Sequence, residues 1–179
     1  MTDDRRSDVV AGVVVLVASF LLGGLTSWAQ GFLPDQVASF ANSASGWMIL
    51  TALLVWWADR GPVLSAFLGA GSFLALVFGY TAASALQDTT YCPTKFGVIA
   101  VLVGPGIGLA ASWLRCRGWR LAAGSAVLAG VAIGEAIYGL TVVNDSTSPV
   151  YWVVVGLLGL ALAVVAAVRQ GSDRRSAVA

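Results

Sequence analysis

Apolar residues run through the chain in six long stretches, which short polar or charged segments separate. A helix needs about 20 mostly apolar residues to cross the roughly 30 Å of hydrocarbon in a bilayer. Five stretches reach or approach that length, and the second is shorter. The pattern predicts an all-α, polytopic bundle of six transmembrane helices at Val9–Ala29, Ser43–Ala58, Pro62–Leu86, Phe96–Leu114, Leu121–Val142 and Val150–Val168.

Basic residues are distributed unevenly between the two sides of such a bundle. Six spans place nine arginines on one side and leave Lys95 as the basic residue of the other side. Because positively charged loops stay in the cytoplasm, we expect a multi-pass inner-membrane protein with both termini cytoplasmic. The transmembrane domain then covers residues 9–168, between a cytoplasmic segment at 1–8 and a cytoplasmic tail at 169–179. The nine arginines are Arg5, Arg6, Arg60, Arg115, Arg117, Arg120, Arg169, Arg174 and Arg175.

All seven tryptophans fall near predicted span ends, where an amphipathic indole is most stable. Trp28, Trp47 and Trp152 lie at outer ends, and the other four lie at inner ends. We interpret them as anchors at the two membrane surfaces.

Composition narrows the classes of function. Apolar residues make up 58% of the 179 residues and charged residues 11%, whereas a soluble domain carries about 25% charged residues. The chain has no histidine, which removes histidine-dependent hydrolases and HExxH zinc sites. The net charge of +1 gives no sign of nucleic-acid binding, and Cys92 and Cys116 lack metal-site spacing. We therefore expect a bilayer as the main partner, with no nucleic acid, no enzyme activity, no metal and no cofactor.

Small residues recur at a spacing of four within several spans, which allows two helices to approach closely. We favour packing inside the bundle over a dimer interface for each such stripe. The stripes are Ser19-Gly23-Ser27, Gly104-Gly108 and Gly130-Gly134.

Two features suggest transporter architecture. Gly104-Pro105-Gly106 in the fourth span predicts a kink or break, because proline removes a backbone hydrogen bond. Broken helices form binding sites in many transporters, although simple kinks are commoner. Spans one and four also align without gaps, from Gly12 with Gly97 to Trp28 with Trp113. This alignment suggests a 3+3 inverted repeat.

Glu135 is the single ionisable residue inside a predicted span, where acids are functional candidates by default. Tyr138 lies one turn further along the same face. We expect an outward-facing pocket lined by Glu135, Tyr138, Tyr80 and Asn42. The equally weighted alternative is a structural glutamate that holds two helices together, since nothing in the sequence supplies a partner charge.

The connection after the first span is the longest on the outer side. Apolar residues recur there at helical spacing after Pro34, which suits a first helical position. We expect a short helix on the outer face, which covers the bundle or acts as a lid.

Three segments carry a family resemblance: Ala41-Asn42-Ser43 before Trp47, residues 134–141 (GEAIYGLT) and residues 147–152 (TSPVYW). Together they resemble small six-span bacterial membrane proteins that are catalogued as a domain of unknown function. The resemblance covers nearly the whole chain. It implies six spans and a bacterial, actinobacterial inner membrane, and it implies no activity. A looser likeness of architecture links the chain with substrate-binding subunits of energy-coupling-factor transporters.

These observations predict binding or transport of a small solute through the pocket around Glu135, with a small-molecule or cationic ligand. The alternative is a structural or regulatory subunit that packs against a membrane partner subunit and binds no ligand.

Overall fold

The protein is helical throughout the ordered elements of its computed structural model, which describes residues 2–89, 91–143 and 147–176. Five helices are long and apolar enough to cross a membrane, and a sixth apolar helix, α3, is shorter. The elements in chain order are α1 (Thr2–Ala29), α2 (Asp35–Ala38), the 3₁₀ helix η1 (Ser39–Asn42), α3 (Ala44–Ala58), α4 (Pro62–Leu86), α5 (Thr94–Trp113), α6 (Trp119–Thr141) and α7 (Pro149–Ser176).

All six predicted stretches are helical, and α3 agrees with the second, Ser43–Ala58, to one residue. The 15 residues of α3 rise about 22 Å, which is less than the hydrocarbon thickness. The helix does not extend back into the preceding loop. Ser43, the residue before its first turn, has an extended backbone (φ −129°, ψ 153°). Five spans are therefore supported by length, and the sixth stays a prediction.

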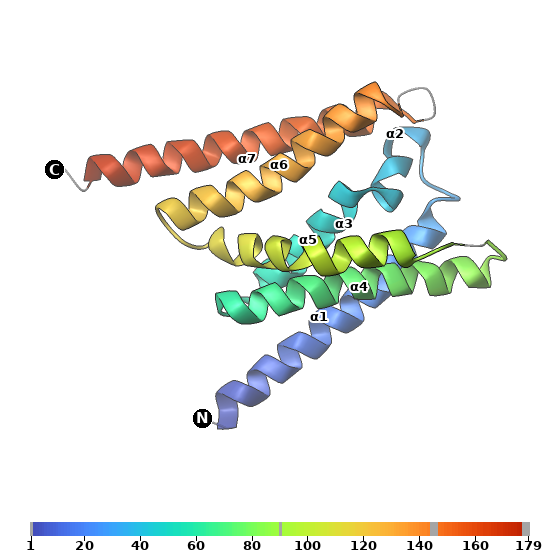
Figure 1. Ribbon diagram of the computed structural model, residues 1–179, viewed down its shortest axis with the longest axis horizontal. Coiled ribbons are helices and arrows are strands. Elements are labelled where there is room, and N and C mark those ends of the chain that lie inside the picture. Colours follow the sequence, from blue (N-terminus) through green and yellow to red (C-terminus); the bar gives the residue numbers. More distant parts are fainter. Residues whose placement is uncertain (1, 90, 144–146, 177–179) are drawn as a thin grey trace.

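The predicted terminal segments are continuations of the first and last helices. α1 begins at Thr2 and α7 ends at Ser176, so both helices extend through the residues that flank their apolar stretches. The start of α1 and the end of α7 lie at one end of the bundle, together with the α3–α4 and α5–α6 connections (Figure 1). The predicted arginine-rich segments are therefore at the same end of the molecule.

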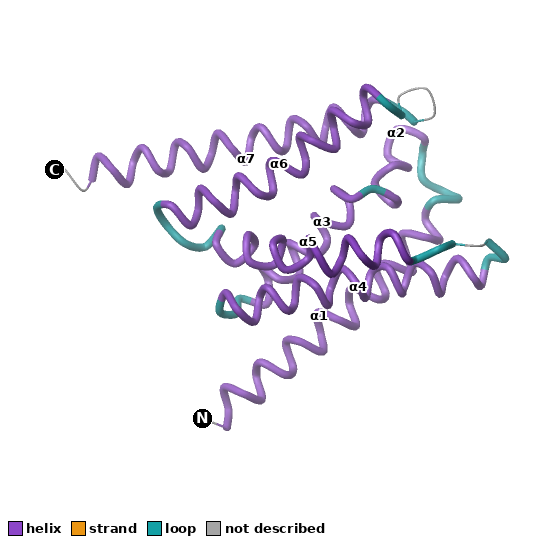
Figure 2. Tube along the Cα trace, viewed as in Figure 1, coloured by secondary structure: helices purple, strands orange, loops and turns teal. Residues whose placement is uncertain are grey.

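The bundle has two parts that diverge. α4 packs closely against both α1 and α5, while α6 and α7 form a hairpin. α6 starts beside the end of α5 and runs away from it, as the traces in Figures 1 and 2 show. α3 lies between the two parts and contacts α1, α4, α5 and α6.

The α1–α4 contact uses the predicted Ser19-Gly23-Ser27 stripe. The Ser19 hydroxyl is 2.8 Å from that of Ser72, and the Ser27 hydroxyl is 2.9 Å from that of Ser84. Between them, a Cβ on Gly23 would lie 2.1 Å from a backbone carbonyl of α4. The interpretation of this stripe as internal packing is confirmed, with hydroxyl pairs that satisfy one another away from water.

The α4–α5 contact uses Gly104 and Gly108 in the same way. A Cβ on Gly108 would lie 2.0 Å from the Ser65 carbonyl oxygen, and one on Gly69 would lie 2.3 Å from the Gly104 carbonyl oxygen. The helix axes approach too closely for any side chain here, which confirms internal packing for this stripe also.

The predicted break at Gly104-Pro105-Gly106 does not occur. α5 continues as one helix from Thr94 to Trp113 with Pro105 inside it. Proline removes only one hydrogen bond of the ladder, and α5 packs closely on α4 at Gly104 before the proline and at Gly108 after it. This segment is a packing element and does not provide broken-helix ends for a ligand.

Gly130 and Gly134 behave differently, since an added Cβ at either position would have no atom within 4 Å. Internal packing is therefore wrong for this stripe.

The two halves of the chain also pack differently, because α1 is closely packed on α4 whereas α5 and α7 have no comparable contact among the described residues. The 3+3 repeat stays a prediction that this packing does not support.

The core is aromatic at the end that lies away from the arginine-rich segments. Trp47 is fully buried, and its ring lies 5.0 Å from that of Phe96, 5.5 Å from that of Tyr80 and 6.0 Å from that of Phe73. Trp152 is also buried, against Gly139. The interpretation as interfacial anchors is wrong for these two tryptophans, whereas Trp28 is more than half exposed.

Candidate functional site

The N-terminus of α3 is a polar centre in the half of the protein that lies away from the arginine-rich end. The first N–H groups of a helix have no acceptor within it, and in α3 those of Ala44, Ser45 and Gly46 are paired with side chains. The regular helical hydrogen bonds begin with Trp47. Ser43 supplies two acceptors, since its side chain accepts from Gly46 N at 3.0 Å and its carbonyl accepts from Trp47 N at 3.2 Å.

Glu135 of α6 supplies the other two acceptors. Its Oε1 accepts from the backbone N–H of Ala44 at 2.7 Å, and its Oε2 accepts from that of Ser45. The carboxylate therefore lies against the positive end of the α3 dipole, where an anion is stabilised. The positive partner of Glu135, which is not apparent in the sequence, is therefore the N-terminus of α3.

Tyr151 of α7 completes the polar cluster. Its hydroxyl lies 2.6 Å from that of Ser43 and 2.9 Å from that of Ser45, and the ring is buried. The cluster thus ties α3 to both helices of the α6–α7 hairpin. It is a cross-link between the two diverging parts of the bundle.

A cavity of about 510 Å³ opens beside this cluster. Its polar lining comes from five segments of the chain, and its apolar lining includes two aromatic rings. The polar residues are Gln30, Ser39, Ser43, Glu135, Tyr138 and Thr147. The apolar residues are Ala38, Ala44, Phe96, Val143 and Trp152.

The structure places the four predicted site residues differently. Glu135 and Tyr138 both line the cavity, and the Tyr138 side chain is 53% exposed. Tyr80 is buried behind the cavity, where its hydroxyl donates to Gln30 Oε1 at 3.0 Å, so it contacts the lining without belonging to it. Asn42 ends η1, and its side chain lies outside the described part of the chain.

The predicted outer helix forms one wall of the cavity. It is shorter than expected and consists of α2 and η1, which contribute Ala38 and Ser39. α2 also contacts α7, so it bridges across the end of the molecule that lies away from the arginines. Its placement fits a cover over the cavity.

Several residues around Glu135 and its cavity were not among the predicted site residues. Ser43 stands directly before an apolar run, which is an N-cap signal, and it could have marked the start of a helix that needs acceptors. Ser45, Phe96 and Tyr151 carried no such signal, because only the packing of three helices brings them to Glu135.

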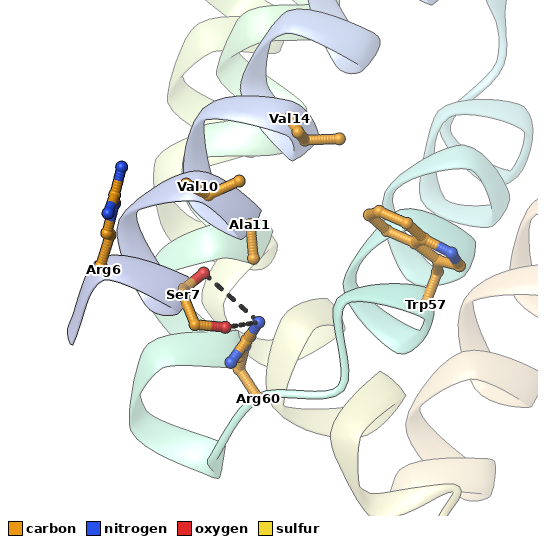
Figure 3. A pocket seen from close by; sticks show the side chains of 7 residues that line it. All are labelled: Arg6, Ser7, Val10, Ala11, Val14, Trp57 and Arg60. Atoms are coloured by element: carbon orange, nitrogen blue, oxygen red, sulfur yellow. Dashed lines mark hydrogen bonds between the residues drawn. The ribbon is translucent and has the colours of Figure 1, made fainter. Parts of the chain in front are cut away.

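A second cavity, of about 370 Å³, lies at the arginine-rich end between α1 and α3. Arg60 donates from Nη1 to Asp8 Oδ1 at 3.0 Å and from Nη2 to the Ser7 hydroxyl at 2.9 Å. Figure 3 shows Arg60 turned toward Ser7, while Arg6 extends from the side of α1 opposite Trp57. These contacts fasten the start of α1 to the α3–α4 connection.

One protein family matches almost the whole chain. A family model described as a family of unknown function, DUF6518, matches residues 2–179. The chain belongs to that family. The match confirms the resemblance to a catalogued domain of unknown function, and it includes α3, Glu135 and every residue that lines the cavity. Neither the curated proteins nor the solved structures contain a match to the chain.

Proposed function

We propose that this protein is a bacterial inner-membrane protein that binds a small solute in the outward-facing cavity around Glu135 and catalyses no reaction. One observation carries the proposal. The carboxylate that caps α3 is not enclosed by its two N–H partners but also lines a cavity of about 510 Å³.

The lining favours a cationic solute with N–H donors. A carboxylate has about four acceptor positions, and two of those on Glu135 are taken by α3. The remaining lone pairs face a cavity whose walls include Phe96, Tyr138 and Trp152. Aromatic faces attract cations, so the same space offers both a counter-charge and π surfaces.

Binding at this carboxylate would act on α3. A ligand cation that draws Glu135 toward the cavity competes with the N–H groups of Ala44 and Ser45. The position of α3 then depends on occupancy, and α3 contacts both parts of the bundle. This coupling supplies the two-state element that transport requires.

A ligand screen tests the proposal. Full-length protein in detergent is heated with tetramethylammonium, putrescine, choline or, as a neutral comparison, glucose. We expect at least one cation to raise the melting temperature by several degrees, and Tyr138→Leu to reduce that shift because it removes an aromatic wall of the cavity. Val127→Leu, on an exposed part of α6 outside the cavity, is the matched control. Equal shifts in both variants, or none in the parent protein, contradict the proposal.

The alternative role as a subunit that packs against a partner helix has one observation in its favour. Gly130 and Gly134 leave an uncovered strip on α6, unlike the glycines that pack inside the bundle. Co-purification of one membrane protein, lost in Gly130→Leu and unaffected by any solute, would favour this role.

Orientation is tested with thiol labelling. Cys92 is exposed in the α4–α5 connection, and Cys116 lies in the α5–α6 connection at the arginine-rich end. The hydrogen bond from Thr94 lowers the pKa of the Cys92 thiol, so its thiolate fraction at neutral pH exceeds that of an ordinary thiol. We expect an impermeant maleimide to label Cys92 in intact cells and to label Cys116 only after lysis. Thr94→Val should slow the Cys92 reaction near pH 7, and labelling of Cys116 alone from outside would reverse the orientation.

A further inference from the structure

A third cavity, of about 600 Å³, lies at the arginine-rich end, between α3, the α5–α6 connection and α7. It is at the opposite end of the bundle from Glu135, and the two cavities have no lining residue in common. Its walls combine three cationic side chains with large apolar ones. The residues that matter here are Trp56, Leu114, Arg115, Arg117, Leu121 and Arg169.

The cations of this cavity exceed the acids that neutralise them. Arg115 pairs with Asp59 at 3.1 Å, donates to the Trp56 carbonyl oxygen at 2.7 Å, and lies over the Trp56 ring. Arg117 and Arg169 form no ion pair with any described residue. Two positive charges therefore face the cavity without a counter-charge from the described side chains.

The first arginine cavity, between α1 and α3, differs in this respect. Of its two lining arginines, Arg60 is already bonded to Asp8 and to Ser7, so only Arg6 lacks an ion pair with a described residue. An anion gains less there than beside Arg117 and Arg169. The third cavity is the stronger anion site of the two.

The apolar walls indicate what kind of anion fits. Leu121 is buried and Trp56 is 42% exposed, and both stand beside the arginines at one end of apolar helices. A molecule that fills the cavity meets guanidinium groups at the end of the bundle and hydrocarbon along α3, α6 and α7. That arrangement of charge and apolar surface matches a phosphate group that carries acyl chains.

We propose that this cavity binds the phosphate headgroup of an anionic phospholipid from the leaflet at the arginine-rich end. Arg117 and Arg169 hold the phosphate oxygens, because a planar guanidinium donates two parallel hydrogen bonds to such a group. Arg115, fixed by Asp59 and Trp56, forms the rear wall. The proposal uses the membrane placement given above and is independent of any solute at Glu135.

Lipid titration of the full-length protein tests this assignment. Native mass spectrometry in detergent compares dioleoyl phosphatidylglycerol, dioleoyl phosphatidylcholine and inorganic phosphate. We expect phosphatidylglycerol to bind most tightly, and Arg117→Gln/Arg169→Gln to weaken it roughly 10- to 30-fold, since each basic residue near a membrane surface contributes about 1 kcal/mol. Arg117→Lys/Arg169→Lys, which keeps both charges, should recover most of the affinity for the anionic lipid.

Arg120→Gln is the matched control, because Arg120 belongs to the same end of the protein, lies over Trp119 and does not line the cavity. It should change the affinity less than about twofold, and Val127→Leu on α6, which lines neither cavity, should leave it unaltered whatever the outcome of the solute screen. Equal binding of the two lipids by the parent protein overturns the proposal without any variant. Inorganic phosphate that binds as tightly as phosphatidylglycerol overturns the lipid assignment, and an equal loss in Arg120→Gln overturns the site.

Discussion

Replacement of Glu135 by leucine is expected to lower the free energy of unfolding by about 2–5 kcal/mol. The change leaves the N–H groups of Ala44 and Ser45 without acceptors at a partly buried helix end. Each buried unpaired donor costs about 1–3 kcal/mol, and the favourable charge at the α3 dipole is also lost. Denaturant or thermal unfolding of the purified protein in detergent measures the effect.

Glutamine at this position should give an intermediate result. Its carbonyl oxygen still accepts from one N–H group, but its NH₂ group meets the other as donor against donor. We expect a loss of about 1–2 kcal/mol, because one of the two acceptors is removed. Tyr138→Leu, one turn away on α6, is the control, since its side chain is 53% exposed, and it should change stability by less than about 0.5 kcal/mol. A leucine variant as stable as the parent would show that α3 does not depend on this cap.

Replacement of Gly108 by alanine is expected to destabilise the α4–α5 contact by about 1–3 kcal/mol. The new methyl group would lie 2.0 Å from the Ser65 carbonyl oxygen and 2.9 Å from Gly69 Cα, and both obstacles are backbone atoms. Neither can rotate aside, so the two helices must separate. The midpoint of thermal unfolding in detergent should fall by several degrees.

Gly106→Ala is the matched control on the same helix. An added Cβ there has no neighbour within 4 Å, and alanine forms helix more readily than glycine by up to about 1 kcal/mol. We expect Gly106→Ala to leave the unfolding midpoint unchanged or to raise it. Equal destabilisation by both variants would mean that the Gly–Pro–Gly segment is sensitive as a whole and that close packing at Gly108 is not the cause.

Glu135 and Tyr138, two of the four residues expected to share a pocket, line the same cavity. An acid in an apolar stretch is conspicuous in any sequence, and Tyr138 follows from helical periodicity on the same helix. Tyr80 was placed in the pocket from its depth along a helix, but depth does not specify which face is turned inward. It points into the aromatic core beside Trp47 and Tyr91 instead.

The sequence by itself determined the helical class, the positions of five long spans and the separation of arginines to one end. Hydrocarbon thickness sets the length of each apolar stretch, and charge sets the side of each loop, without regard to which helices become neighbours. Only the tertiary structure decided that Pro105 lies in an unbroken helix, that two glycine stripes are buried while Gly130 and Gly134 are not, and that Glu135 caps α3. Each of these depends on which helix faces which. In a chain so rich in small and apolar residues, many pairings satisfy the same pattern, and the choice among them rests on close backbone contacts and on acceptors for the first N–H groups of one short helix.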